Sequence, residues 1–141
     1  MSNFVTAIPP APSAEALLHF EAEFRFETDC FDVHDAFARG GELGFVLLDV
    51  RSHALYAEGH VPGAVSLPHG KIVESKLAQY PQDTLFITYC AGPHCNGASR
   101  GAARLAKLGR PVKVMAGGIT GWLDDGYRLA KGSTEQAADA A

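Results

Sequence analysis

Apolar runs of strand length alternate along the chain with segments that have helical periodicity. The apolar runs predict four strands, at residues 44–50, 64–68, 84–89 and 111–118. The segments around them predict six helices, at residues 13–28, 30–41, 52–59, 71–80, 98–109 and 119–127. Strands that alternate with helices are typical of an α/β domain with a mainly parallel sheet and right-handed crossovers.

The first helical segment precedes all of the apolar strands. Ser13 is placed to act as its N-cap, and Leu17, Phe20 and Phe24 follow at helical spacing. We expect Phe20, Phe24 and Phe26 to be buried against the domain, because large aromatic side chains gain most from leaving water. Packing on another subunit is the alternative.

The domain organisation follows from length and composition. A chain of 141 residues favours one domain. Residues 1–12 include a proline-rich stretch and predict a flexible lead-in, and residues 13–28 predict a helical extension. The domain itself is expected at residues 29–130, and the small polar tail at residues 131–141 is predicted to be disordered.

Charge and hydropathy exclude some classes of function. The formal net charge of −4 disfavours nucleic acid and an anionic membrane as partners. The N-terminus lacks the basic and apolar regions of a signal peptide, and no stretch reaches the roughly 18 apolar residues of a transmembrane helix. We therefore expect a cytoplasmic protein, in which the three cysteines are free or reactive rather than a disulfide framework.

Several chemistry-bearing residues stand where predicted strands end. Cys90 follows the strand at 84–89, and Asp49 and Arg51 lie at the end of the strand at 44–50. The pair Gly117-Gly118 ends the last strand. Parallel sheets bind ligands beyond the carboxyl ends of their strands, so these three ends are expected to converge on one edge of the sheet.

The loop after Cys90 has the features of a cradle for a cysteine nucleophile. It reads YCAGPHCNGASRG and leads into the helix that begins near Ala98. Backbone N–H groups of a curled, glycine-containing loop and of a helix start stabilise a thiolate. The residues alone leave open that Cys90 is an inert buried side chain and that His94 is an exposed loop residue.

Three segments in this order resemble the signatures of the rhodanese-like domain family. They read LLDVRSHALYAEGHVPGAVSLP, YCAGPHCNGASRGAARLAKLG and VKVMAGGITGWLDDGY. The resemblance covers about residues 31–129. It implies a three-layer α/β sandwich, with a mainly parallel central sheet and helices on both faces.

The resemblance implies a rhodanese-type sulfurtransferase with Cys90 as nucleophile. Its thiolate would take sulfur from thiosulfate or a persulfide donor and hold it as a persulfide. The acceptor would be cyanide, a thiol or a protein, and neither an organic cofactor nor a metal is needed.

The same resemblance assigns roles to the residues around Cys90. Backbone N–H groups of the substrate-binding loop would hold the charged sulfur. This loop comprises Ala91, Gly92, Pro93, His94, Cys95, Asn96 and Gly97. Structural support of the site is expected from Asp49, Arg51 and His60.

Cys95 is a candidate resolving thiol, because it stands five residues after Cys90. It would attack the Cys90 persulfide, release hydrosulfide and leave a disulfide, or it would protect Cys90 from over-oxidation. A redox module built on Cys90 and Cys95 is therefore one alternative function.

Three other functions compete with sulfur transfer. A phosphatase of related fold is rejected, because Asn96 stands where that chemistry needs an arginine. A metal site of Cys90, His94 and Cys95 lacks the usual C-x2-C spacing. A non-enzymatic binding or regulatory module of the same fold remains open.

Overall fold

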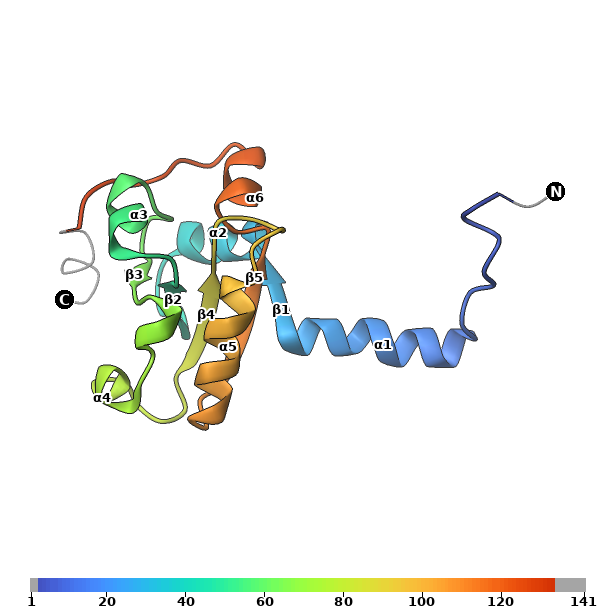
Figure 1. Cartoon of the computed structure of the whole chain (residues 1–141), viewed down its shortest axis with the longest axis horizontal. Coiled ribbons are helices and arrows are strands. Elements are labelled where there is room, and N and C mark those ends of the chain that lie inside the picture. Colours follow the sequence, from blue (N-terminus) through green and yellow to red (C-terminus); the bar gives the residue numbers. More distant parts are fainter. Residues whose placement is uncertain (1–2, 134–141) are drawn as a thin grey trace.

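A five-stranded parallel sheet forms the centre of the computed structural model, which describes residues 3–133 (Figure 1). The strand order is β1-β5-β4-β2-β3, and every neighbouring pair is parallel. The strands are β1 (Glu27–Asp29), β2 (Phe45–Asp49), β3 (Val65–Ser66), β4 (Leu85–Tyr89) and β5 (Val112–Ala116). All strand carboxyl ends therefore share one edge of the sheet, as predicted.

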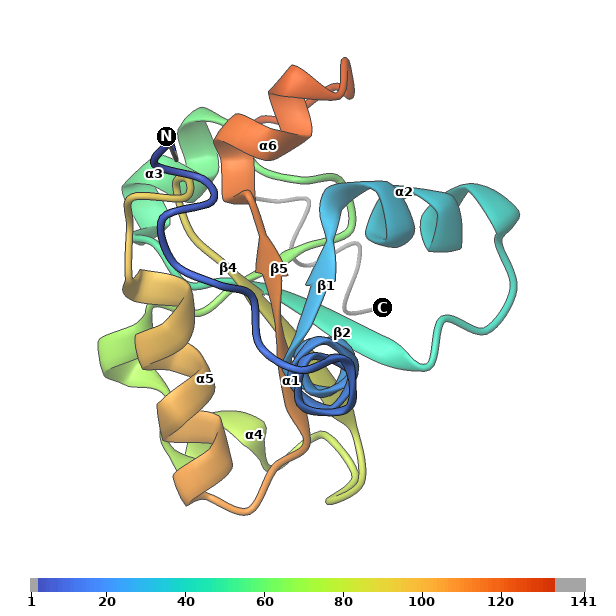
Figure 2. The same cartoon turned by 90° about the vertical axis from the view of Figure 1, so that its right-hand side faces the viewer.

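Helices cover both faces of this sheet (Figure 2). One face carries the 3-10 helix η1 (His69–Lys71), α4 (Glu74–Leu77) and α5 (Gly97–Lys107). The other face carries α2 (Cys30–Arg39), α3 (His53–Glu58) and α6 (Gly118–Asp124). This arrangement confirms the predicted three-layer α/β fold with a parallel central sheet.

The central strands supply side chains to two separate cores. Leu47 and Ile87 pack in the core beneath α2, α3 and α6, whereas Leu48 and Phe86 pack in the core beneath η1, α4 and α5. None of these four side chains is more than 3% exposed. A strand buried on both faces needs apolar residues at every position, which explains the continuous apolar runs.

Helix α1 (Ser13–Phe26) extends away from the sheet (Figure 1). None of its residues is buried. The predicted burial of its aromatic side chains is therefore wrong, since Phe20, Phe24 and Phe26 are 56%, 70% and 64% exposed. Helical spacing predicted the helix, but it contains no information on whether a sheet face lies within reach.

The start of α1 also differs from the prediction. Pro12, not Ser13, is the N-cap, because the Pro12 carbonyl accepts the first helical hydrogen bond, from the Ala16 N–H at 2.9 Å. The Ser13 side chain makes no capping bond, since this residue already lies within the helix.

The end of the predicted helix at 13–28 is wrong as well, because residues 27–29 form strand β1. This strand is short and polar and pairs with β5 at the edge of the sheet, so it has no apolar run to reveal it. Asp29 then accepts a hydrogen bond from the Asp32 N–H at 2.8 Å and caps α2. The chain thus passes from strand to helix within one residue.

The helix predicted at residues 71–80 is divided into η1 and α4. Val73 lies between them with extended backbone (φ −135°, ψ 160°), which interrupts the helical hydrogen bonds. The disorder predicted for residues 131–141 falls mainly outside the described residues, and the proposed division into lead-in, extension and domain stays a prediction. Within residues 3–133, no helix is both long enough and apolar enough to span a bilayer.

Candidate active site

Cys90 lies directly after β4, at the edge where the carboxyl ends of the strands meet. Tyr89 and Cys90 point to opposite faces of the sheet, so the tyrosine joins the core under α2, α3 and α6 and the cysteine joins the core under α5. Cys90 is 7% exposed. The neighbouring strand end is fixed beside it, because the Val50 N–H donates to the Tyr89 carbonyl at 3.1 Å.

Helix α6 holds the first part of the loop. The Ile119 N–H donates to the Cys90 carbonyl at 3.1 Å, and the Thr120 N–H donates to the Ala91 carbonyl at 2.9 Å. The Thr120 hydroxyl donates to the same Ala91 oxygen at 3.1 Å. Gly118 permits this approach, because its φ is +56° and a Cβ there would collide with the Cys90 carbonyl.

Helix α5 holds the last part of the loop. The Thr88 hydroxyl in β4 donates to the Ala98 carbonyl at 2.9 Å and so ties the first turn of α5 to the sheet. The Gly97 N–H points at Cys95 Sγ, 3.4 Å away. Arg100 Nε donates to the Asn96 side-chain oxygen at 3.1 Å, which keeps a cation at the border of the loop.

A disulfide joins Cys90 and Cys95, whose Cα atoms are 6.4 Å apart. A turn brings Cys95 back toward the strand end, because its N–H donates to the Gly92 carbonyl at 3.1 Å. Gly97 provides the space, since a Cβ there would lie 2.7 Å from Cys90 Sγ and 3.4 Å from Cys95 Sγ. The curled loop thus brings both sulfurs together in the disulfide that was one expected outcome of a reactive Cys90–Cys95 pair, and Cys30 stays a free thiol.

Cys30 is the free cysteine of the chain, and it is buried. Its thiol donates to the carbonyls of Ala116 at 3.6 Å and Gly118 at 3.5 Å, beneath the glycine turn that positions α6. Burial, with smaller contributions from Asp125 and Asp29, raises the pKa of Cys30 to about 11. At neutral pH this residue is a protonated structural thiol rather than a nucleophile.

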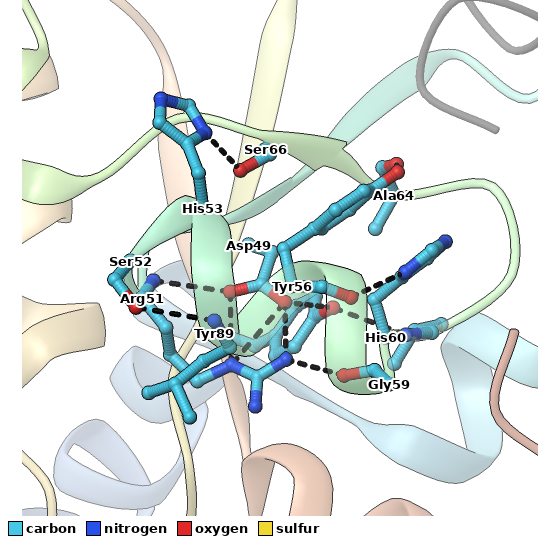
Figure 3. Close-up of polar contacts among 12 residues, drawn as sticks. Asp49, Arg51, Ser52, His53, Tyr56, Gly59, His60, Ala64, Ser66 and Tyr89 are labelled. Carbon is cyan, nitrogen blue, oxygen red and sulfur yellow. Dashed lines mark hydrogen bonds and ion pairs between the residues drawn. The ribbon is translucent and has the colours of Figure 1, made fainter. Parts of the chain in front are cut away.

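A buried polar network lies behind the strand end that carries Cys90 (Figure 3). The Asp49 carboxylate pairs with Arg51, whose two nearest nitrogens lie 2.6 and 3.0 Å from its oxygens. The Tyr89 hydroxyl donates to Asp49 at 2.7 Å and accepts from the Val61 N–H at 3.1 Å. Arg51 also donates to the Gly59 carbonyl at 2.7 Å, so the network joins β2, β4 and the segment after α3.

Charge and burial fix the protonation states of this network. Burial and the Asp49 carboxylate raise the pKa of Tyr89 well above its usual value, so the phenol remains a donor. Burial opposes the charge of Arg51, but the hydrogen bonds and charge of Asp49 outweigh it and raise the pKa of Arg51. The network therefore keeps one arrangement of donors and acceptors at neutral pH.

His60 lies next to this network and is completely buried. Its ring stacks on Tyr56 with the centroids 3.7 Å apart, and Nδ1 donates to the Tyr56 carbonyl at 2.8 Å (Figure 3). Its backbone N–H donates to the Ala130 carbonyl at 2.9 Å. His60 thus ties the segment after α3 to the segment after α6.

A model of the family described as the rhodanese-like domain matches residues 32–125, more than half of the 141-residue chain. The chain belongs to the rhodanese-like domain family. The three sequence signatures, the parallel sheet and the cysteine after β4 agree with this assignment.

Similar proteins include a solved structure and a curated regulator. The BH2092 protein of Bacillus halodurans shares 37% identity and a TM-score of 0.81, over 86% of this chain and 88% of that chain. The HTH-type transcriptional regulator Rv0324 of Mycobacterium tuberculosis is 36% identical over 97 residues. The match covers 67% of this chain but only 42% of that regulator.

A thiosulfate sulfurtransferase of Pseudomonas aeruginosa shares the fold. It is 24% identical, with a TM-score of 0.64, over 79% of this chain and 21% of that chain. Identity at this level supports the rhodanese-like architecture alone.

The remaining predicted loop residues lie at the surface of this rhodanese-like domain. Ala91, Pro93, His94 and Asn96 are exposed, and Gly92 is partly buried against Thr120. No three histidine, cysteine or acidic side chains among residues 3–133 gather in a group that could hold a metal ion. The alternative of a metal site at Cys90, His94 and Cys95 therefore has no support in the geometry.

Sequence reasoning missed three residues that hold the loop in place. Tyr89 connects the strand end to Asp49, Thr88 fixes the start of α5, and Thr120 binds the Ala91 carbonyl. The signal for Tyr89 was a hydroxyl-bearing aromatic residue at the last position of a buried strand. Thr120 had only its place after Gly117-Gly118 to indicate a role.

Proposed function

We propose that this rhodanese-like domain is a sulfurtransferase that carries sulfane sulfur as a persulfide on Cys90. The position of Cys90 carries the proposal: it lies at the carboxyl end of β4, at the start of a loop that is tied to both α5 and α6. The disulfide to Cys95 occupies its sulfur, so reduction of this bond precedes sulfur loading.

The proposed first step is attack of the Cys90 thiolate on the outer sulfur of a donor. With thiosulfate, the sulfur–sulfur bond of the donor breaks and sulfite leaves with the electron pair. With a low-molecular-weight persulfide, a thiolate leaves instead. The sulfur on Cys90 then passes to cyanide, to a small thiol or to a protein thiol, and free Cys90 returns.

The loop backbone is suited to hold the charge of the persulfide. Gly97 already directs its N–H at a sulfur atom, and it stands at the start of α5, where the helix dipole favours negative charge. We include residues 91–97 in the proposed cradle. In this proposal Asp49, Arg51 and His60 act as positioning residues, which keep the end of β4 in place beneath it.

Mass spectrometry of the reduced protein tests the proposal. After brief anaerobic exposure to thiosulfate or to glutathione persulfide, Cys90 is expected to gain one sulfur atom, which cyanide removes. Cys90→Ser is expected to gain none, whereas Ala106→Ser, an exposed change on α5, loads normally. Cys30 is an internal standard, because its pKa near 11 keeps it unmodified.

A regulatory module is the second candidate function, because the curated relative is a transcriptional regulator. This candidate predicts no loading of sulfur by either donor on a protein whose Cys90 is reduced and accessible to alkylation. That result would overturn the sulfurtransferase proposal.

A further inference from the structure

Cys95, the second cysteine of the loop, is bonded to the Cys90 sulfur atom that the proposed reaction uses. Cys95 is exposed, and the turn closed by the Gly92 carbonyl directs it back to Cys90. In the structure it is bonded to Cys90 Sγ itself. In a persulfide on Cys90, that atom is the inner sulfur, and attack there releases the outer one.

We propose that Cys95 resolves the Cys90 persulfide within the same chain, so that the domain releases hydrosulfide from sulfane sulfur donors. The inference rests on the proposed function, because sulfur must first be loaded on Cys90. It adds the step that removes the sulfur from Cys90, and it adds the product of that step, hydrosulfide.

Atoms and electrons balance in this step. The Cys95 thiolate attacks Cys90 Sγ, and a bond forms between the two cysteine sulfurs. The bond from Cys90 Sγ to the outer sulfur breaks, and hydrosulfide leaves with its electron pair. The two cysteines are oxidised to the disulfide, the sulfane sulfur is reduced to sulfide, and the proton lost by the Cys95 thiol leaves on the hydrosulfide.

The shape of the loop favours this intramolecular step. The lack of a side chain at Gly97 leaves room for both sulfurs, and its N–H donates to the Cys95 sulfur. The carbonyls of Cys90 and Ala91 are bound to α6, so the Cys90 side is fixed while Cys95 approaches. Proximity of this kind converts a bimolecular thiol exchange into a step with a high effective concentration.

The unequal exposure of the two cysteine residues also determines how the disulfide is reopened. Cys95 is exposed, whereas Cys90 is 7% exposed. An external dithiol reductant therefore attacks Cys95, and Cys90 leaves as the thiolate that begins the next cycle. The second thiol of the reductant then releases Cys95, and the reductant leaves as a disulfide.

Single-turnover sulfur loading of reduced protein, without oxygen or external reductant, tests the proposal. Glutathione persulfide is added to wild type, Cys95→Ser, Cys95→Ala and the control Ala106→Ser, and excess donor is removed. Peptide mass spectrometry then follows the fate of the sulfur while a sulfide probe follows its release. Cys95 is exposed, so both of its substitutions leave the packed core intact.

Wild type and Ala106→Ser are expected to release sulfide in proportion to the protein and to end as the Cys90–Cys95 disulfide. Both Cys95 variants are expected to retain sulfur on Cys90 at least tenfold longer. Equal persistence of the persulfide in all four proteins would overturn the inference while leaving the sulfurtransferase proposal intact. Sulfur found on Cys95 without sulfide release would also overturn it, and no loading in any protein would overturn both proposals.

Discussion

Helix α1 and the loop of residues 90–97 differ in what holds their backbones in place. Helix α1 is regular over fourteen residues, yet it buries none of them. Most of the loop has no regular structure, but its carbonyls accept hydrogen bonds from α5 and α6, and a disulfide joins its two cysteines. The helix is held by its own hydrogen bonds, and the loop is held by the rest of the domain.

This difference indicates which substitutions should disturb the site. A short helix in water gains little stability from its own hydrogen bonds, and most helices depend on a buried face. The loop depends on side chains and glycines that lie far from it in sequence, such as Asp49 and Gly118. Changes at those distant positions should disturb the site more than loss of the whole of α1.

The largest effect is expected from Asp49→Ala, beneath the loop. This change leaves the Arg51 guanidinium, which is 9% exposed, and the Tyr89 hydroxyl without the carboxylate that they share. An uncompensated buried charge costs about 3–5 kcal/mol of unfolding free energy. Urea unfolding measures the loss of stability. Sulfur loading of Cys90 should also fall, because Asp49 holds the side chain of Tyr89, the residue directly before Cys90.

The matched control is Asp35→Ala, which breaks another aspartate–arginine pair at the same 2.6 Å separation. Arg39 and Asp35 are 77% and 45% exposed, so water replaces the lost partner and the unfolding midpoint should stay close to that of wild type. Equal losses in the two variants would contradict the difference between buried and exposed contacts.

The same difference explains what the sequence predicted and what it did not. The strands β2 and β4 were predictable because burial on both faces leaves continuous apolar runs. Strand β1 was not, because a three-residue polar edge strand is defined by its partner β5 rather than by its own residues. Helical periodicity predicted α1 correctly as a helix, whereas the expectation that its aromatic side chains are buried was wrong.

The candidate site divides in a similar way. The place of Cys90 directly after β4 was predictable, since a strand end followed by a glycine-containing loop is a local pattern, and its role as nucleophile stays a prediction. The contact between Thr120 and the Ala91 carbonyl joins residues 29 positions apart, so no local sequence pattern predicts it. The pairing of Cys90 with Cys95 was foreseeable only as one outcome of their spacing, because the direction of the turn at Gly92 decides it.

A smaller effect is expected from Gly118→Ala, which acts on the contact between α6 and the loop. The positive φ costs an alanine about 1–2 kcal/mol, and the new Cβ would also push against the Cys90 carbonyl. Displacement of the loop should lower the rate of sulfur loading by roughly tenfold or more. Stopped-flow loading with mass-spectrometric detection measures this rate.

Gly126→Ala is the control that separates the cost of backbone strain from the effect of the contact between Gly118 and the Cys90 carbonyl. Gly126 also has a positive φ, +85°, but a Cβ there meets nothing within 4 Å. This variant should lose only the stability that the positive φ costs, about 1–2 kcal/mol, and load sulfur at the wild-type rate. If both variants load equally slowly, the contact between Gly118 and Cys90 does not position the loop.

The smallest effect is expected from removal of residues 1–26, which deletes α1 and retains β1. Since α1 buries no residue, the unfolding free energy should change by no more than about 0.5 kcal/mol, and loading of Cys90 should be unchanged. Urea unfolding at several protein concentrations measures both the size and the origin of any loss. A larger loss that grows with concentration would mean that the exposed Phe20 and Phe24 pack on a second copy of the chain, and α1 would then be held by tertiary contacts just as the loop is.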